Sequence, residues 1–372
     1  MSASAPPLPG RRPKVNLALQ GGGSHGAFTW GVLDALLEDG RLALDGISGA
    51  SAGAVNAVAL AHGFAKAGDA GDPARTAARQ AARETLERVW RRVAGVGAPG
   101  ALASQFMRML FGQAPAFPSL TTDPWASPYQ FNPLGINPLR TLLDQEIDFD
   151  ALATLDSPRV YVSATQVRTG RAQIFHGAQL TLSAVMASAC LPTMFQAVEI
   201  DGEPYWDGGY SANPALLPLI ENCESADIVL VQLNPLHRAD TPRTPHEIAQ
   251  RVDELAFNAS LISQMRSIDF MQQLLADGRL QEGRQFRQLR LHRIDIDSAL
   301  DDPLPSSSKL STDIAMIEQL FERGRHAAQD WLARHIDDVG RRTTIDIQAD
   351  YVAGAPLPTE PVAKRAPQLR SA

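Results

Sequence analysis

The sequence has few of the features that mark exported, metal-binding or membrane-spanning proteins. It contains only two cysteines, Cys190 and Cys223, which are too few for a disulfide framework and lack metal-ligand spacing. No apolar run approaches the roughly twenty residues needed to cross a bilayer. We therefore expect a protein of a reducing, cytoplasmic setting, with no metal and no other cofactor.

An excess of basic residues is also missing. Lys and Arg total 34 against 41 Asp and Glu, which gives a formal net charge of −7. The net charge of the chain does not attract nucleic acid or anionic lipid. Any electrostatic docking on a membrane must therefore depend on a local cluster of charges. We expect no nucleic-acid partner. A peripheral lipid contact stays open, and the sequence does not determine the oligomeric state.

The domain organisation follows from composition along the chain. Residues 1–14 are rich in proline and lack the apolar segment of a secretory signal, so we interpret them as a disordered leader. A single large α/β domain is expected over 15–340, with a mainly helical extension over 245–340. Residues 341–372 have few large apolar side chains and are interpreted as a flexible tail.

Short apolar segments alternate with longer segments of helical spacing. Strands are predicted over 15–19, 42–48, 159–165, 228–233 and 289–296, with hairpins over 165–175 and 198–206. Helices are predicted over 28–37, 52–60, 74–93, 137–147, 180–189, 245–275 and 311–336, the last capped by Ser311 or Thr312. This alternation indicates a mostly parallel sheet with helices on both faces.

A glycine-rich turn, Gly21-Gly22-Gly23-Ser24-His25-Gly26, joins the first predicted strand to the first predicted helix. Such a turn leaves unpaired N–H groups at the helix N-terminus, where a phosphate or a developing oxyanion can bind. The turn also matches a dinucleotide fingerprint, which needs an acidic residue about twenty positions later at the end of a second strand. Asp45 has that spacing but precedes the apolar residues of its strand. Nucleotide binding is therefore the weaker alternative.

The stretch Gly49-Ala50-Ser51-Ala52-Gly53 has the composition of a nucleophile elbow. Gly49 and Gly53 remove Cβ atoms that would clash where a strand turns sharply into a helix, and Ser51 occupies the strained apex. A nucleophile and a cluster of backbone N–H donors are the two parts that acyl transfer needs.

A serine nucleophile needs a base, and Asp207 is the best candidate. Gly208 and Gly209 follow it directly and leave its carboxylate uncrowded on a tight loop. An aspartate of ordinary pKa is a poor base for serine. The dyad therefore requires a desolvated carboxylate and an oxyanion site.

A Ser-His-Asp triad is the rival arrangement, and its histidine would follow Asp207 in the chain. Five histidines do so, but none lies in a setting that marks it as catalytic: His237, His246, His292, His326 and His335. His25 is tied to the motifs by position, and we interpret it as polar lining of the site rather than as a general base.

Two further segments have open interpretations. The helix over 74–93 has an apolar stripe that is expected to pack on the core, although a basic amphipathic helix meeting a lipid surface is the alternative. Residues 94–137 are rich in glycine, proline and aromatic side chains. We expect this insert either to cover the Ser51 site as a lid or simply to pack over the core.

Together, these motifs resemble the patatin-like phospholipase family. The glycine-rich turn, the Ser51 elbow and Asp207-Gly208-Gly209 occur in the family's order, supported by Ala164-Thr165 through Gly170-Arg171 and by Ala187-Ser188-Ala189-Cys190-Leu191-Pro192. The resemblance covers about residues 15–233. One departure is His25, where many members have Arg or Lys.

The resemblance implies a three-layer α/β/α sandwich and a Ser-Asp dyad without a catalytic histidine. Ser51 would be the nucleophile, Asp207 the base, and backbone N–H groups around Gly22, Gly23 and Ser24 the oxyanion donors. The implied activity is hydrolysis of lipid acyl esters, as a phospholipase A or esterase, through an acyl-enzyme and without a metal in most members. A catalytically weak regulatory or binding protein on the same fold is the alternative.

Overall fold

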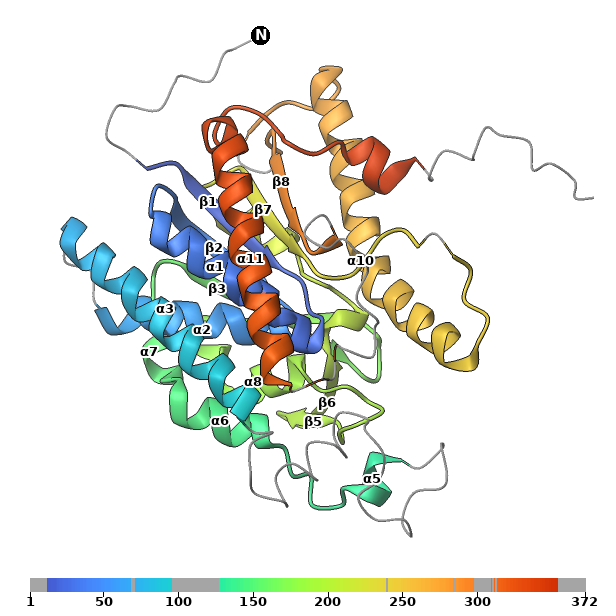
Figure 1. Ribbon diagram of the computed structural model, residues 1–372. Coiled ribbons are helices and arrows are strands. Elements are labelled where there is room, and N and C mark those ends of the chain that lie inside the picture. Colours follow the sequence, from blue (N-terminus) through green and yellow to red (C-terminus); the bar gives the residue numbers. More distant parts are fainter. Residues whose placement is uncertain are drawn as a thin grey trace, which may run out of the picture.

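The computed structural model describes residues 12–67, 71–95, 127–238, 240–283, 286–297, 309, 311 and 313–353. Nearly all of the predicted leader, most of the predicted lid-like insert and the last part of the predicted tail lie outside these residues. The rest of the chain forms a central sheet with helices on both sides (Figure 1).

Eight strands of the described chain form one sheet in the order β5-β6-β3-β2-β1-β7-β8, and β4 also pairs with β3. Their bounds are β1 Lys14–Leu19, β2 Ala43–Gly49, β3 Arg159–Gln166, β4 Ala172–His176, β5 Val198–Ile200, β6 Glu203–Asp207, β7 Asp227–Gln232 and β8 Arg290–Asp295. Strands β3, β2, β1, β7 and β8 pair in parallel, whereas β4, β5 and β6 pair antiparallel at one side. The predicted mostly parallel sheet is confirmed.

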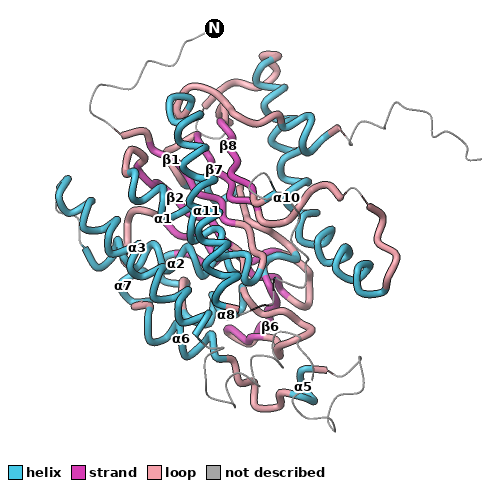
Figure 2. The backbone as a smooth tube through the Cα atoms, viewed as in Figure 1, coloured by secondary structure: helices cyan, strands magenta, loops and turns pink. Residues whose placement is uncertain are grey.

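Helices cover both faces of this sheet (Figure 2). One face is covered by α1 Gly26–Asp39, α2 Ala52–Ala67, α3 Gly71–Gly95, α6 Pro138–Glu146 and α11 Ile314–His335. The other face is covered by α9 Leu217–Asn222 and α10 Pro245–Ala276. The remaining α-helices of the described chain are short: α5 Pro128–Phe131, α7 Phe149–Ala153 and α8 Leu182–Ser188. Helices α5, α7 and α9 were not predicted from the sequence.

The strand pleat explains the layers. Successive side chains of a strand point to opposite faces. Accordingly, Leu17 and Leu19 of β1 belong to the core under α1, α2 and α11, whereas Ala18 between them belongs to the core under α9 and α10. In β7, Val229 faces the first core and Leu230 the second. Strands buried on both faces read as continuous apolar runs, as these do.

Helix α3 packs on the core with its apolar stripe. Leu86 and Val89 are fully buried, and Trp90 is nearly so and donates from Nε1 to Asn56 Oδ1 of α2 at 2.9 Å. The stripe is therefore occupied inside the protein, which confirms the core-packing interpretation over the lipid-surface one. Within the described ranges, no helix combines the length and the apolarity needed to cross a bilayer.

The C-terminal region differs from expectation in two places. Helix α11 is capped by Asp313, whose Oδ1 accepts from the Met316 N–H at 3.0 Å, and not by Ser311 or Thr312. The first part of the predicted tail packs on the sheet: Tyr351 is buried and donates from Oη to Gln232 Oε1 at 2.7 Å. A buried aromatic ring with a satisfied hydroxyl anchors this segment, a contact that its polar composition concealed.

Candidate active site

Ser51 lies between the end of β2 and the start of α2 with a positive φ of 52°, an uncommon conformation for a non-glycine residue. Gly49 and Gly53 permit this sharp turn. A Cβ on Gly49 would lie 2.4 Å from the Gly53 carbonyl oxygen, and one on Gly53 would lie 2.1 Å from that of Leu19. The predicted strand–elbow–helix geometry is therefore present, with both glycines required by close backbone approach.

Ser188 of α8 holds the elbow from the other side. Its Oγ accepts the Ser51 N–H at 2.9 Å, and its side chain is fully buried. Because an unpaired buried N–H is destabilising, this bond supports the strained backbone at Ser51. No local motif marks Ser188 as a partner of the elbow. Its distance of 137 positions from Ser51 hid the contact.

Strand pairing brings Asp207 to Ser51. Gly49, at the end of β2, pairs with Val162 of β3, and Asp207, at the end of β6, pairs with Ala164 of the same strand. Since β6 runs antiparallel to β3, its last residue arrives just beyond the point where β2 ends. The topology thus delivers the carboxylate to the elbow across 156 positions of sequence.

The loop after Asp207 is packed on both sides. A Cβ on Gly208 would lie 2.0 Å from the Ser163 carbonyl oxygen, and one on Gly209 would lie 2.1 Å from the Phe257 ring of α10. Asp207 Oδ1 accepts the Gly209 N–H at 2.7 Å, whereas Oδ2 is buried and has no hydrogen-bond partner among the described residues. One carboxylate oxygen is therefore fixed, and the other can accept a proton.

The environment makes Asp207 a stronger base than an exposed aspartate. Its side chain is fully buried, and this desolvation raises its pKa to about 7, against the lowering effect of the Gly209 N–H and the Ser51 hydroxyl. Because Oδ2 lacks a partner at hydrogen-bond distance, we regard the Ser51 hydroxyl as a close neighbour of the carboxyl group rather than as a bonded donor. Desolvation, which the dyad requires, is present.

The glycine-rich turn lies directly against the elbow. A Cβ on Gly21 would come within 2.8 Å of the Ser51 Cβ, and one on Gly26 within 2.7 Å of the Ala52 Cβ. The turn therefore brings the N-terminus of α1 beside that of α2. The N–H groups of Gly22, Gly23 and Ser24 have no acceptor among the described residues, as is usual at a helix start. Three backbone donors are therefore available at this helix start.

Buried amide side chains fix the turn. Gly21 donates its N–H to Asn213 Oδ1 at 2.6 Å, and its carbonyl accepts from Asn234 Nδ2 at 2.9 Å. Gln20 Oε1 accepts from the Leu233 and Asn234 N–H groups, and its Nε2 donates to Asn258 Oδ1 of α10 at 3.0 Å. The Gly21 N–H is thus used to support the turn. These amides were not predicted because no local motif marks them.

His25 is part of the turn, and its side chain is buried. Burial, together with the neighbouring Lys309 and Arg238 charges, lowers its pKa to about 3. Lys309 lies beside Gly23 and donates from Nζ to Asn234 Oδ1 at 2.5 Å. The polar-lining role of His25 stays a prediction. Lys309, the positive charge beside the turn, was not predicted from the sequence.

The rival motifs have other partners. His292 bonds to Asp227 Oδ1 at 3.2 Å and to Thr344 Oγ1 at 3.0 Å, beside the first residue of β7 and so at the opposite strand end from Ser51. Asp45 accepts the N–H groups of Glu224 and Ser225 through Oδ2. It cannot serve as the ribose ligand of a dinucleotide fingerprint, which belongs at the carboxyl end of its strand.

A family model described as patatin-like phospholipase matches residues 17–220, more than half of the chain. No curated protein matches the sequence. Among solved structures, VipD from Legionella pneumophila is 14% identical, with a TM-score of 0.39, over 87% of this chain and 67% of that one. The ExoU–SpcU complex of the type III secretion system of Pseudomonas aeruginosa gives 16% identity and a TM-score of 0.35, over 88% of this chain and 52% of that one.

Proposed function

The chain belongs to the patatin-like phospholipase family, and on this premise we propose that it hydrolyses acyl esters of lipids, as a phospholipase A or esterase, through a Ser51–Asp207 dyad. Family membership supports lipid acyl hydrolysis in general. The dyad, and with it the class of serine hydrolases acting on carboxylic ester bonds, is our specific proposal.

In the proposed first step, Ser51 Oγ attacks the ester carbonyl carbon while Asp207 Oδ2 takes the hydroxyl proton. The carbonyl oxygen becomes an oxyanion, to which the N–H groups of Gly22, Gly23 and Ser24 donate. Collapse expels the alcohol, which receives the proton, and leaves an acyl-enzyme on Ser51. Asp207 then takes a proton from a water molecule that attacks the acyl carbonyl carbon. Collapse breaks the bond to Ser51 Oγ and releases the fatty acid, while Asp207 returns the proton to Ser51 Oγ.

The observation that carries the proposal is the state of Asp207. Its carboxylate is buried, one oxygen is fixed by Gly209, and the other has no partner in the described chain although the carboxyl group neighbours the Ser51 hydroxyl. A polar atom left unsatisfied in a protein core calls for an explanation, and a base awaiting its proton supplies one.

Labelling with a fluorophosphonate tests the dyad. We expect one adduct on Ser51 in the wild-type protein, detected by intact mass and peptide mapping, no adduct in Ser51→Ala, and labelling slowed at least 100-fold in Asp207→Asn. Ser267→Ala is a matched control, because that hydroxyl lies on α10 and donates to the Ser263 carbonyl of the same helix. Its labelling should equal that of the wild type.

Two results would overturn the proposal. An adduct on another serine would move the nucleophile, and unchanged labelling and ester hydrolysis in Asp207→Asn would remove the base. Wild-type protein that is folded, yet inert to the probe and to a broad ester panel, would instead favour the catalytically weak binding protein on the same fold.

A further inference from the structure

The N-terminal half of α10 presents apolar side chains to solvent. Ile248, Val252 and Leu255 are 46%, 58% and 52% exposed, and their spacing of four and three residues places them on one face of the helix. We call these three residues the α10 stripe. Single exposed apolar residues are normal, but three at successive helical positions form a continuous surface.

Two polar residues of the same helical turns are buried, roughly a quarter turn round the helix from the stripe. Glu254 and Asn258 are only 2% and 3% exposed. Glu254 bonds to Arg238 at 2.6 Å and to Arg251 at 3.0 Å, and Asn258 bonds to Gln20 under the glycine-rich turn. Some of the buried contacts of these turns are therefore polar, while the three aliphatic side chains of the stripe face solvent.

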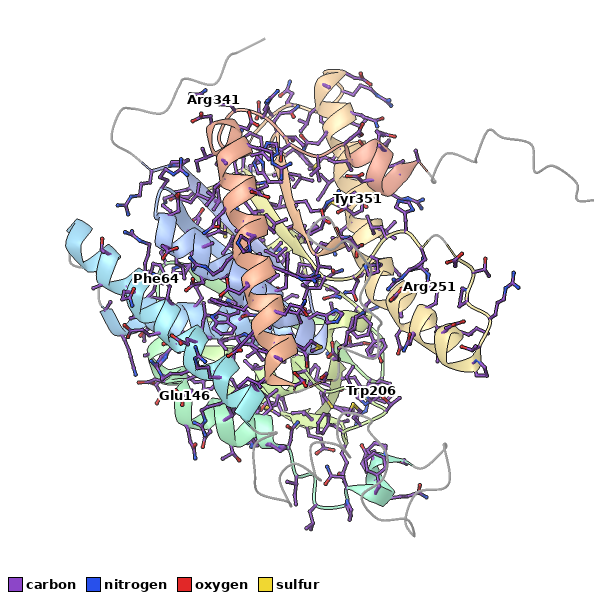
Figure 3. All side chains as sticks on the ribbon, in the orientation of Figure 1. Phe64, Glu146, Trp206, Arg251, Arg341 and Tyr351 are labelled. Atoms are coloured by element: carbon purple, nitrogen blue, oxygen red, sulfur yellow. The ribbon has the colours of Figure 1, made fainter. Side chains whose placement is uncertain are left out.

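The α10 stripe is close to the candidate active site. Phe257 of α10 packs on Gly209, and its ring centroid lies 5.1 Å from that of Tyr210. Both residues belong to the loop that follows Asp207. At about 1.5 Å per residue, Ile248 lies roughly 14 Å further along the helix. Figures 1 and 3 show this half of α10, marked by Arg251, projecting away from the sheet.

A second exposed apolar pair lies in another segment of the chain. Leu134 and Ile136 are 81% and 50% exposed, in the loop between α5 and α6. That loop is tied to the segment before β5, because Gln196 donates to the Asn132 carbonyl at 2.8 Å. Strand β5 pairs with β6, which ends at Asp207, so this loop is linked through β5 to the strand that carries Asp207.

We propose that the α10 stripe docks on the surface of lipid aggregates and places the entrance to the Ser51 site against them. This inference rests on the proposed function, since an acyl-ester substrate held in a bilayer must leave it to reach Ser51, which is only 9% exposed. An amphipathic helix lying in the interface with its apolar face toward the acyl chains provides such contact without any need for net positive charge.

The small size of the stripe favours lipid over a second copy of the chain. A stable protein interface buries roughly 800 Å² on each partner and involves about 20–30 residues a side. Three half-exposed aliphatic side chains offer far less. In a lipid interface each inserted side chain contributes by itself, so a narrow stripe is sufficient.

Vesicle binding tests the proposal independently of catalysis. In a Ser51→Ala background, which removes the proposed nucleophile, we would sediment the protein with phosphatidylcholine vesicles and compare it with an Ile248→Ser, Val252→Ser, Leu255→Ser variant. The vesicle partition coefficient should fall at least tenfold. Serine adds no charge, so electrostatic repulsion cannot produce this loss.

Phe270→Ser is the matched control. Phe270 is 62% exposed on the same helix. It lies about 20 Å beyond Phe257 along the helix axis, toward the C-terminus, whereas the stripe lies toward the N-terminus. Its partition coefficient should stay within twofold of the parent protein. Thermal melts of both variants should remain within about 3 °C of the parent, because exposed substitutions rarely affect folding.

Equal sedimentation of the parent and the triple variant would overturn the docking proposal, as would an equal loss in Phe270→Ser. A parent protein that ignores vesicles but forms a dimer dispersed by the triple substitution would overturn it in favour of a second copy. Stripe-dependent vesicle binding by a protein that hydrolyses no ester would leave docking standing while the proposed function fails.

Discussion

At the scale of single residues, Asp207 shows how burial converts an ordinary side chain into a base. An exposed aspartate is ionised at neutral pH and binds protons weakly. In the folded protein Asp207 is buried at the end of β6, and desolvation raises its pKa to about 7. The hydrogen bond from the Gly209 N–H only partly opposes this shift. Proton affinity is thereby matched to neutral pH, at the expense of native-state stability when the group is ionised.

This shift predicts that stability falls as pH rises. The folded protein holds a proton on Asp207 up to about pH 7, whereas the unfolded chain releases it near pH 4, so between these values the native state binds more protons. About three pKa units at about 1.4 kcal/mol each give a loss approaching 4 kcal/mol between pH 4 and pH 8. Urea unfolding of the wild type and Asp207→Asn at both pH values measures it.

The asparagine variant isolates this residue, because every other titrating group is shared. The difference in unfolding free energy between the two proteins should change by up to about 4 kcal/mol across this range. If the unfolding free energies of the two proteins changed in parallel with pH, Asp207 would titrate alike in the folded and unfolded states. Its pKa would then not be raised by folding.

At the scale of elements, helices α1 and α11 approach each other unusually closely. A Cβ on Gly31 of α1 would lie 2.0 Å from the Phe321 carbonyl oxygen of α11, and one on Gly324 of α11 would lie 2.1 Å from the Phe28 carbonyl oxygen of α1. The relation is reciprocal: each helix has a glycine against the backbone of the other. Because α1 begins at the glycine-rich turn, this contact also holds one wall of the candidate site.

Gly324→Ala should therefore force the two helices apart. We expect a loss of about 2–3 kcal/mol in unfolding free energy, typical of overpacking, and a melting temperature lower by roughly 5 °C. Gly283→Ala is the matched control, since a Cβ there meets nothing within 4 Å. Scanning calorimetry of both variants measures the effect, and equal melting temperatures would show that the helix contact adapts freely.

At the scale of the whole molecule, the region beyond the family match completes the domain. The match ends at residue 220, yet β7 beyond it pairs with β1 and in turn with β8. Helix α11 contributes Ile317, Leu320 and Trp331 to the same core as Val15 of β1. The first strand and the last long helix thus share one core. A core built from both ends of a chain is expected to fold cooperatively rather than in halves.

A chain ending at residue 233 should consequently fail to fold. It lacks α11, which packs on α1, and β8, which pairs with the outer edge of β7. We expect aggregation in size-exclusion chromatography and loss of near-UV circular dichroism. A chain ending at residue 353 keeps every described element and should behave as the full protein does. A folded, monomeric 1–233 fragment would show that the C-terminal elements are an addition rather than part of the core.

Much of the fold was predictable, because its signals are local. Gly49 and Gly53 predict a sharp turn, and the apolar composition of residues 228–233 predicts a buried strand. The buried amides Asn213 and Asn234, which hold the turn, gave no such signal, since a polar residue in a loop is ordinarily solvated. The packing of residues 341–353 was concealed for the same reason.

The sequence by itself determined the identities of the chemical groups: a serine at a glycine-flanked apex, a turn with free N–H groups, and an aspartate before two glycines. These depend on local backbone geometry, which neighbouring residues dictate. Only the tertiary structure decided that β6 pairs with β3 beyond the end of β2, that Asp207 is buried, and that α10 turns apolar residues outward. Proximity, desolvation and exposure arise from contacts between segments far apart in the chain, which no local pattern encodes.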